Sequence, residues 1–239
     1  MTWSETTILV LIMLALVAWL LWVSASRLDR LHRKVVASRL ALDSQLVRRS
    51  AAAVDLAASG ALDPVSSVLV AEAAHESSVA EDSGGHQLVA AVPDLADLVA
   101  LTRQDAADHR APTRKGVSRA LGTGFSDDRA QAESILSATL RTVLEDPTEV
   151  EELYRSPDGD ALLEALAAAW YRVQLARRFH NEAVAQAQRV RSKAVVRAVR
   201  LAGHAVMPET VELDDAWPTA LRRPGATGGR GASTGTLSA

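Results

Sequence analysis

The residues best suited to chemistry in this chain include His75, which is followed directly by Glu76. A zinc-protease helix requires a second histidine four residues after the first, and Val79 holds that position. A phosphoacceptor histidine is also often followed by an acid, but no glycine-rich nucleotide site comes after this one. The segment Gly122-Thr123-Gly124 is too short to form a phosphate loop. We therefore interpret His75 as a surface or helix-capping histidine.

A second histidine, His180, interrupts an otherwise apolar row of helical spacing. We expect a hydrogen-bonded core histidine, with a ligand or pH-sensing role as the alternative. A basic run near it could bind phosphates, although a long helix needs solvating charge in any case and no aromatic residues interleave: Arg189, Arg191, Lys193, Arg197 and Arg200.

Acidic residues gather between Glu145 and Glu164, where eight acids accompany Arg155 alone. An ionic match with the basic run or with a partner explains them better than a carboxylate active site. No Ser-His-Asp arrangement can be defended from the order of residues. The sequence therefore names no catalytic, cofactor-binding or metal-binding residue.

Composition narrows the function further. The 239 residues include no cysteine, which excludes disulfides, thiolate metal sites and cysteine nucleophiles. A net charge of −3 argues against a nucleic-acid-binding protein. Aromatic residues make up 4% and alanine is abundant, which favours helices packed through small side chains.

The elements that would position these residues begin with an apolar segment at residues 6–26. Its 21 residues carry no charge, and eleven are Leu, Ile or Val. As a helix it would span about 30 Å, the thickness of the hydrocarbon core of a bilayer. A cleaved signal peptide is the alternative, with Val23-Ser24-Ala25 as the cleavage site, but residues 1–5 contain no Lys or Arg. We predict a retained transmembrane helix.

Flanking charges predict the orientation of this helix. Only Glu5 precedes it, whereas five cations follow against Asp29 alone: Arg27, Arg30, Arg33, Lys34 and Arg39. The positive-inside rule therefore places the C-terminal body in the cytoplasm and the N-terminus outside. The same cations would lie near anionic lipid headgroups.

No proline or glycine occurs between the apolar segment and Gly60, so residues 24–59 are predicted to continue it as one helix. Apolar residues recur along this stretch at spacings of three and four. A second row widens the apolar surface enough to face more than one helix: Val36, Leu40, Val47 and Val54. Asp63 and Pro64 predict the start of the next helix, which would stop at Gly84-Gly85.

Periodicity weakens in residues 86–128 and then returns. A helix is expected from Asp127 or Asp128 to about Asp146, ended by Pro147. A short acidic helical turn at residues 148–154 and a turn at residues 156–159 would follow.

The last predicted helix is the longest regular pattern after the first. Asp160 would cap it, and helical spacing continues for about forty residues until Gly203. From residue 216 onward the chain is rich in Pro, Gly, Arg, Ser and Thr, which predicts disorder.

Three short segments resemble the LemA family of membrane-anchored bacterial proteins. Leu42-Asp43-Ser44-Gln45-Leu46-Val47-Arg48-Arg49 is similar to a family segment built on a Gln-Leu-x-Arg-Arg core, and Ala74-His75-Glu76 is similar to its His-Glu element. Ala176-Arg177-Arg178-Phe179-His180-Asn181-Glu182-Ala183-Val184 resembles its Ala-Arg-Arg-Tyr-Tyr-Asn-x-Ala-Val signature. The resemblance covers about residues 6–215.

The chain also departs from the family pattern. Ala52-Ala53-Val54-Asp55-Leu56 stands where the family usually has Ile-Pro-Asn-Leu-Val, and the later Tyr-Asn and Phe-Pro elements are missing. The resemblance implies an antiparallel helical bundle on a single anchor and offers no catalytic residues to carry over.

We therefore expect an all-α protein. Residues 1–26 would form a short N-terminus and transmembrane helix, residues 27–215 a LemA-like antiparallel bundle of long helices with an inserted loop region near 86–128, and residues 216–239 a disordered tail. The expected function is that of a non-enzymatic cytoplasmic scaffold that contacts membrane lipid and binds an unidentified protein or a second copy of itself. No nucleic acid, small-molecule substrate or cofactor is expected. The alternatives are His-dependent signalling or catalysis, and binding of anionic lipid.

Overall fold

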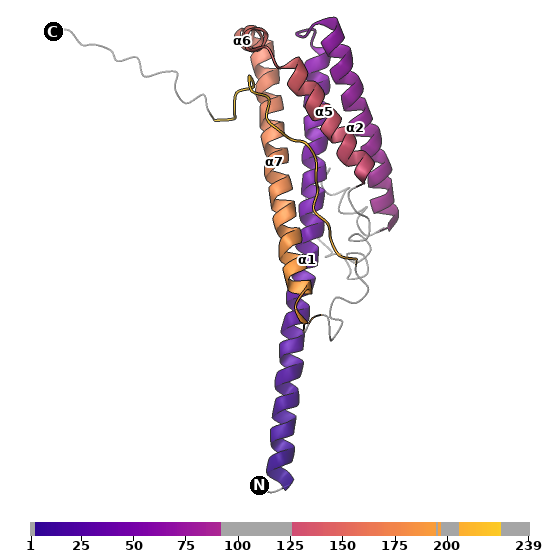
Figure 1. Ribbon diagram of the computed structural model, residues 1–239, viewed down its shortest axis with the longest axis vertical. Coiled ribbons are helices and arrows are strands. Elements are labelled where there is room, and N and C mark those ends of the chain that lie inside the picture. Colours follow the sequence, from indigo (N-terminus) through magenta and orange to yellow (C-terminus); the bar gives the residue numbers. More distant parts are fainter. Residues whose placement is uncertain (1–2, 92–125, 195, 197–205, 226–239) are drawn as a thin grey trace, which may run out of the picture. The chain divides into compact units, whose positions relative to one another are not determined.

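The computed structural model describes residues 3–91, 126–194, 196 and 206–225, with the side chains of Glu5 and residues 81–91 left aside. The described residues form five α-helices and no strand, which confirms the predicted all-α class. In chain order the helices are α1 (Trp3–Ala58), α2 (Pro64–Ala91), α5 (Asp127–Val143), α6 (Pro147–Arg155) and α7 (Pro157–Arg191) (Figure 1). Residues 92–125, most of the expected inserted loop region, lie outside this description.

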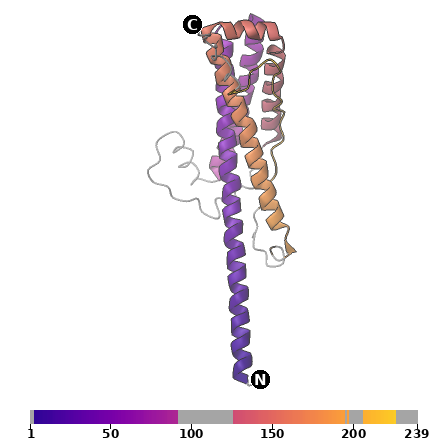
Figure 2. The same cartoon turned by 90° about the vertical axis from the view of Figure 1, so that its left-hand side faces the viewer.

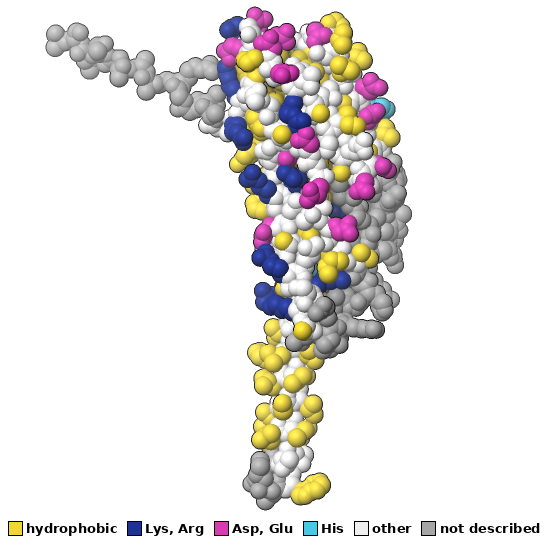
Figure 3. Space-filling model, in the orientation of Figure 1, with side chains coloured by type: hydrophobic (Ala, Val, Ile, Leu, Met, Phe, Trp, Pro, Cys, Tyr) yellow, Lys and Arg dark blue, Asp and Glu magenta, His cyan; other side chains and the backbone are white. Residues whose placement is uncertain are grey.

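The sequence predicts that residues 24–59 continue the apolar segment as one helix. Helix α1, Trp3–Ala58, confirms this prediction. The N-terminal part of α1 is long and apolar enough to cross a membrane, and none of its most apolar stretch is buried within the protein. The large apolar side chains from Ile8 to Val23 are mostly exposed (Figure 3). Water around each such side chain costs about 1.5–3 kcal/mol relative to an apolar environment. This segment is therefore suited to lipid.

The chain divides into two compact units, and both α1 and α7 contribute to each of them. Unit 1 comprises Met1–Ala41, Ser83–Ser126 and Arg178–Val211, and unit 2 comprises Leu42–Asp82, Asp127–Arg177 and Glu212–Ala239. In unit 1, α1 and α7 bury apolar residues of helical spacing, including Leu28, Val35, Val36, Ala183, Val184 and Ala187. Lys34 Nζ donates to Gln186 Oε1 at 3.3 Å on the outside of the same unit.

Unit 2 contains the main hydrophobic core. All five of its helical segments contribute to it, and α6 lies across the ends of the other helices (Figure 2). Alanines of α1 and α2 let these two helices approach closely, whereas α5 and α7 supply larger side chains, among them the fully buried Trp170. The core leucines include Leu56, Leu136, Leu140, Leu144, Leu163 and Leu166.

The turn between α1 and α2 forms as its residue types predict. Gly60 has φ +72°, a left-handed conformation that favours glycine just after a helix. Asp63 caps α2, because its Oδ1 accepts from the backbone N–H groups of Val65 and Ser66 at 2.9 and 3.1 Å. Pro64 then occupies the first helical position, where no backbone N–H is needed.

Two predicted helix ends are wrong. Helix α2 runs through Gly84-Gly85 to Ala91, because a glycine inside a helix costs only about 1 kcal/mol and need not end it. Helix α5 ends at Val143, and Pro147 begins α6 instead of ending α5. The carboxylate of Asp146 caps α6 by accepting from the Thr148 N–H at 2.7 Å.

The predicted turn at residues 156–159 is the first turn of α7. Ser156 Oγ accepts from the Gly159 N–H at 3.1 Å, so serine followed by proline starts the helix before Asp160. A side chain at Gly159 would collide with the Leu153 carbonyl, which explains the glycine at this close approach. Helix α7 ends at Arg191, before the predicted end near Gly203, and residues 197–205 lie outside the described part.

The prediction that the disordered tail begins at residue 216 is wrong, because residues 216–225 belong to the ordered part of the protein. Residues 206–225 are extended rather than helical, but Leu221 is only 3% exposed and belongs to the core of unit 2. Trp217 packs against the same core and its ring lies 6.3 Å from that of Trp170. Two apolar anchors therefore order this segment, and the remaining residues 226–239 lie outside the description.

Candidate functional site

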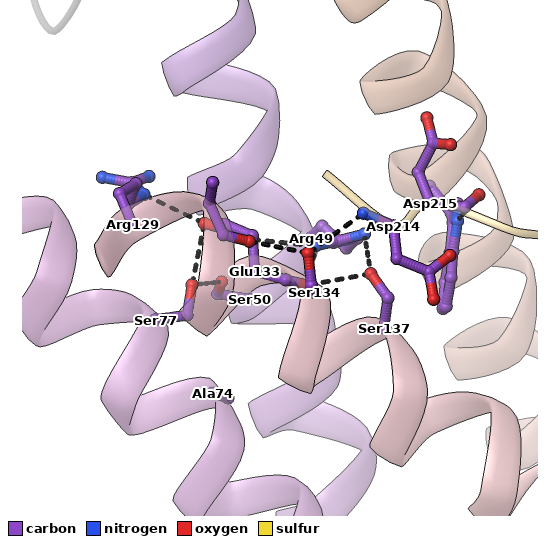
Figure 4. A network of polar contacts seen from close by, with 12 residues as sticks. Arg49, Ser50, Ala74, Ser77, Arg129, Glu133, Ser134, Ser137, Asp214 and Asp215 are labelled. Carbon is purple, nitrogen blue, oxygen red and sulfur yellow. Dashed lines mark hydrogen bonds and ion pairs between the residues drawn. The ribbon is translucent and has the colours of Figure 1, made fainter. Parts of the chain in front are cut away.

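A fully buried arginine on α1 forms the centre of a polar network in unit 2 (Figure 4). Arg49 Nη2 donates to Glu133 Oε2 at 2.8 Å and to the Glu133 carbonyl at 3.1 Å. Its Nη1 donates to Ser137 Oγ at 2.8 Å. The guanidinium also stacks over Trp170, with Cζ 5.1 Å from the ring centroid, so the cation contacts both an acid and an aromatic face.

Glu133 of α5 joins three helices through its carboxylate. Besides Arg49 it accepts from Ser77 Oγ of α2 at 2.9 Å and from Arg129 Nε at 3.1 Å, both at Oε1. Ser77 in turn lies 2.9 Å from Ser50 Oγ of α1 (Figure 4). Arg129, Glu133 and Ser137 are spaced by four residues, which brings them to one face of α5.

The electrostatics of this network are compensated internally. Burial lowers the pKa of Arg49, whereas the adjacent Glu133 carboxylate raises it and keeps the guanidinium charged. Arg49 Nε is buried and has no hydrogen-bond acceptor among the described residues. The Glu133 carboxylate accepts hydrogen bonds from Arg49, Ser77 and Arg129, so the network joins α1, α2 and α5 as a structural brace.

The extended segment after α7, residues 206–225, is held beside this network by two consecutive acids, Asp214 and Asp215. The Asp215 carboxylate accepts from Arg177 Nε and Nη2 at 2.9 and 2.8 Å. Its carbonyl accepts from Trp170 Nε1 at 3.1 Å and Gln174 Nε2 at 2.7 Å. Trp170 therefore contacts both Arg49 and the docked segment.

Asp214, the residue before Asp215, is also held by side chains of α5. Asp214 accepts from Arg141 Nη1 at 2.8 Å and also pairs with Nη2, and its backbone N–H donates to Ser134 Oγ at 3.0 Å. The hydrogen bonds from Arg141 are the main cause that lowers the pKa of Asp214. The pairing consequently persists well below neutral pH.

Further along, Arg222 fastens the end of the segment to α6. Its guanidinium Cζ lies 4.0 Å from the centroid of the Tyr154 ring, and Nη2 donates to Glu151 Oε2 at 2.7 Å. Its backbone N–H donates to the Tyr154 hydroxyl at 3.0 Å. Side chains of α5, α6 and α7 thus replace the backbone partners that a helix or strand would supply.

The two histidines singled out in the sequence take different places. His75 is exposed on α2, and no group of His, Asp and Glu able to hold a metal occurs among the described residues. His180 in unit 1 is 3% exposed, with Nδ1 3.1 Å from Ser38 Oγ, which confirms the predicted core histidine. Burial is the main cause that lowers its pKa to about 4.

The predicted match between the basic run and the acidic region is not among the described contacts. Arg189 pairs with Glu182 and Arg191 donates to the Val206 carbonyl, both within unit 1. In unit 2, Glu151 pairs with Arg222. Arg197 and Arg200 lie outside the described residues.

Sequence reasoning missed the acids of the network. Arg49 was singled out only through the LemA resemblance, and Glu133, Asp214 and Asp215 were not identified. The four-residue spacing of Arg129 and Glu133 was the available signal, but it is equally typical of an exposed helical ion pair. Comparison with protein-family models, with curated proteins and with solved structures gives no match to this chain.

Proposed function

We propose that this protein is a non-enzymatic scaffold of the LemA type, anchored in the membrane by α1, whose helical body binds a protein partner or a second copy in the cytoplasm. The observation that carries the proposal is α1 itself. One unbroken helix joins an exposed apolar segment to residues buried in the core of unit 2. A partner bound by the body would therefore be held at the membrane.

The motif residues that resemble LemA have roles consistent with a shared fold. Arg49 from the first motif joins α1 to α5 through hydrogen bonds to Glu133 and Ser137, and its guanidinium lies over Trp170 of α7. Arg177 and Asn181 from the last motif hold the extended segment, Arg177 through Asp215 and Asn181 through two hydrogen bonds to the backbone of Val211. The residues that carry the resemblance therefore have structural roles within the helical body.

A scaffold is also supported by the state of the candidate reactive groups. The buried carboxylate of Glu133 and the buried imidazole of His180 are both engaged by other side chains. His75 is exposed, and within the described part of the chain it belongs to no group of His, Asp and Glu that could hold a metal. Phosphate on His75 in cells, or an activity lost in His75→Ala with folding intact, would instead establish the signalling alternative.

The topology can be tested with a reporter fused after Ala239 and with protease added to intact cells. A cytoplasmic reporter and a protected body are expected, because the cations that follow the apolar segment favour the inside. Proximity labelling from the same fusion, with pull-down by the full chain in detergent, then identifies partners. An external body, or the recovery of neither partner nor self-association, would contradict the scaffold.

A second candidate function, anionic-lipid binding, rests on the cations of unit 1. Lys and Arg side chains gather directly beyond the apolar part of α1 (Figure 3). Arg30 lines an open surface hollow with Trp22, Val23, Ser26 and Asp29. A tryptophan beside a guanidinium suits the interface and its phosphates. Photo-crosslinking in nanodiscs should label the full chain more with phosphatidylglycerol than with phosphatidylcholine, and Arg27→Gln/Arg30→Gln should abolish the difference.

A further inference from the structure

Helices α1 and α7 run in opposite directions within unit 1 (Figure 1). Lys34 of α1 donates to Gln186 of α7 at 3.3 Å. Farther along α1, Ser38 lies 3.1 Å from His180, which comes earlier in α7. The last turn of α7, at Arg191, therefore lies toward the part of α1 that leaves the apolar segment.

The register of these helices gives the level of that last turn. Arg191 lies five residues beyond Gln186, so it comes level with Asp29, five residues before Lys34. Burial, and then the charge of Arg191, lower the pKa of His32, one turn from Asp29, which agrees with this placement. Asp29 is three residues beyond the apolar segment, or about 5 Å of helix. The headgroup layer on each side of a bilayer is about 5–8 Å thick, so the end of α7 comes level with the headgroups when α1 spans the membrane.

The extended segment after α7 also reaches this level. Gln188 Nε2 donates to the Pro208 carbonyl at 2.8 Å, and Arg191 Nη1 donates to the Val206 carbonyl at 2.6 Å. Positions nearer the end of α7 thus bind earlier positions of the segment. Val206 therefore lies at the last turn of α7, at the end of unit 1 from which the apolar segment extends.

Two adjacent apolar side chains are exposed at this end of unit 1. Val206 is 54% and Met207 44% exposed, although the next residue, Pro208, is buried. Exposed cations lie at the same end, Arg27 on α1 and Lys193 directly after α7. Apolar side chains accompanied by Lys and Arg are typical of segments that lie in the membrane interface.

We propose that Val206 and Met207 insert into the lipid interface beside α1, with Arg27 and Lys193 on the lipid phosphates, as a second contact between the body and the bilayer. The inference rests on the proposed function, because it takes α1 as a membrane anchor. The anchor and the second contact belong to one compact unit and lie at the same level, so both reach one bilayer surface together. The second contact restricts rotation of unit 1 about the axis of α1 and keeps one side of it turned toward the lipid.

A bound protein would also cover Val206 and Met207, but their level favours lipid, since a bilayer spanned by α1 is present there in any case. Unit 1 offers a matched control in Phe179, an apolar side chain of α7 that is 62% exposed. By the same register Phe179 comes level with Ala41, about 20 Å beyond the apolar segment. Lipid should therefore reach Val206 and Met207 without reaching Phe179.

The absence of cysteine from the chain permits a direct test with single bimane labels. Val206→Cys, Met207→Cys and Phe179→Cys are made in the full chain and placed in nanodiscs of phosphatidylcholine and phosphatidylglycerol that carry nitroxides on their headgroups. We expect about twofold or greater quenching at Val206→Cys and Met207→Cys, and little at Phe179→Cys. Equal quenching at all three positions, or none at the first two, would overturn the proposal. A blue-shifted emission there without quenching would identify a protein cover and would equally overturn it.

A label in the apolar segment separates failure of this inference from failure of the anchor. Val17→Cys should be quenched by nitroxides on the lipid acyl chains, because Val17 lies within the uncharged part of α1. Quenching there, with none at Val206→Cys and Met207→Cys, would refute the second contact and leave the anchored scaffold standing. No quenching at Val17→Cys would refute the anchor itself.

Charge reversal tests the part played by the cations. Lys193→Glu should lower the quenching of Met207→Cys about twofold or more, because a carboxylate at this level is repelled by lipid phosphates. An unchanged value would refute the contact between Lys193 and the phosphates.

Discussion

Replacing Glu133 by glutamine would test whether the buried polar network holds unit 2 together. The side chain keeps its shape, but the charge that compensates Arg49 and Arg129 is lost. Arg49 donates to one carboxylate oxygen of Glu133, and Ser77 and Arg129 donate to the other. In glutamine one of these oxygens is replaced by an NH2 group, which would face a donor instead of accepting from it.

The expected cost follows from the burial of the pair. Arg49 and Glu133 side chains are both 0% exposed. Removing one partner of such a pair costs about 3–5 kcal/mol, because the remaining charge is buried without compensation. Since the net stability of a domain is only about 5–15 kcal/mol, we expect Glu133→Gln to lower the unfolding temperature by roughly 6–20 °C.

Thermal and urea unfolding of the full chain in detergent is monitored by circular dichroism. Glu182→Gln is the matched control, because Glu182 and Arg189 form an ion pair that is more than half exposed and is worth at most about 1 kcal/mol. A double-mutant cycle with Arg49→Met should give a coupling energy above about 1 kcal/mol. A loss below about 1 kcal/mol for Glu133→Gln, or no coupling, would refute the view of this pair as a brace.

Three further predictions concern Trp170, His180 and Asn181. Trp170→Ala should cost about 3–5 kcal/mol of unfolding free energy in the same assay, since the ring is fully buried and contacts Arg49. Burial lowers the pKa of His180 to about 4 in the folded protein. As the pH falls, this histidine is therefore protonated in the unfolded chain before it is protonated in the folded one. Stability should therefore decrease from about pH 6.5 to about pH 4, and urea midpoints of His180→Gln should lack this part of the decrease. Asn181→Leu removes both side-chain hydrogen bonds to Val211 and should speed amide hydrogen exchange at Val211 at least tenfold, whereas an unchanged rate would show that other contacts hold the segment.

The longest elements could be predicted from the sequence because their signals agree over many residues. Helix α1 has no proline or glycine before Gly60 and keeps one apolar periodicity after its uncharged segment. The start of α2 at Asp63 and Pro64 also follows from local chemistry, since both cap and proline act within a single turn.

Helix ends were less predictable because the same residue types serve two purposes. Pro147 can follow one helix or open the next, and the choice depends on whether Asp146 caps α6. Ser156 with Pro157 reads equally as a turn or as a helix start. Gly84-Gly85 weakens a helix without ending it, so neighbouring residues decide the outcome.

The polar network could not be found from sequence because its bonds join distant positions. Arg49 and Glu133 are 84 residues apart, and Arg177 and Asp215 are 38 apart. Nothing local tells a buried arginine from its exposed neighbour Arg48. The distinction arises only when α1 packs so that one of the two points toward α5.

The extended segment was predicted to be disordered because the overall composition of the C-terminal residues hides the few large apolar residues among them. Pro, Gly and Ser predict disorder for the C-terminal residues as a set, yet a few anchors suffice to order part of them. Trp217 and Leu221 bury apolar surface in the core of unit 2, and Arg222 binds α6. A disorder prediction from composition should therefore be checked for isolated large apolar residues.

The placement of the LemA-like residues limits what that resemblance can say about a partner. Arg49 is fully buried, and the part-buried Arg177 and Asn181 use their polar groups to hold the chain's own extended segment. A resemblance carried by such residues concerns the fold. Specificity for a partner must then come from exposed positions, and Val47 and Val54 of α1 are of this kind. Substitutions there should change association while leaving the unfolding temperature unchanged, the reverse of what Glu133→Gln should do.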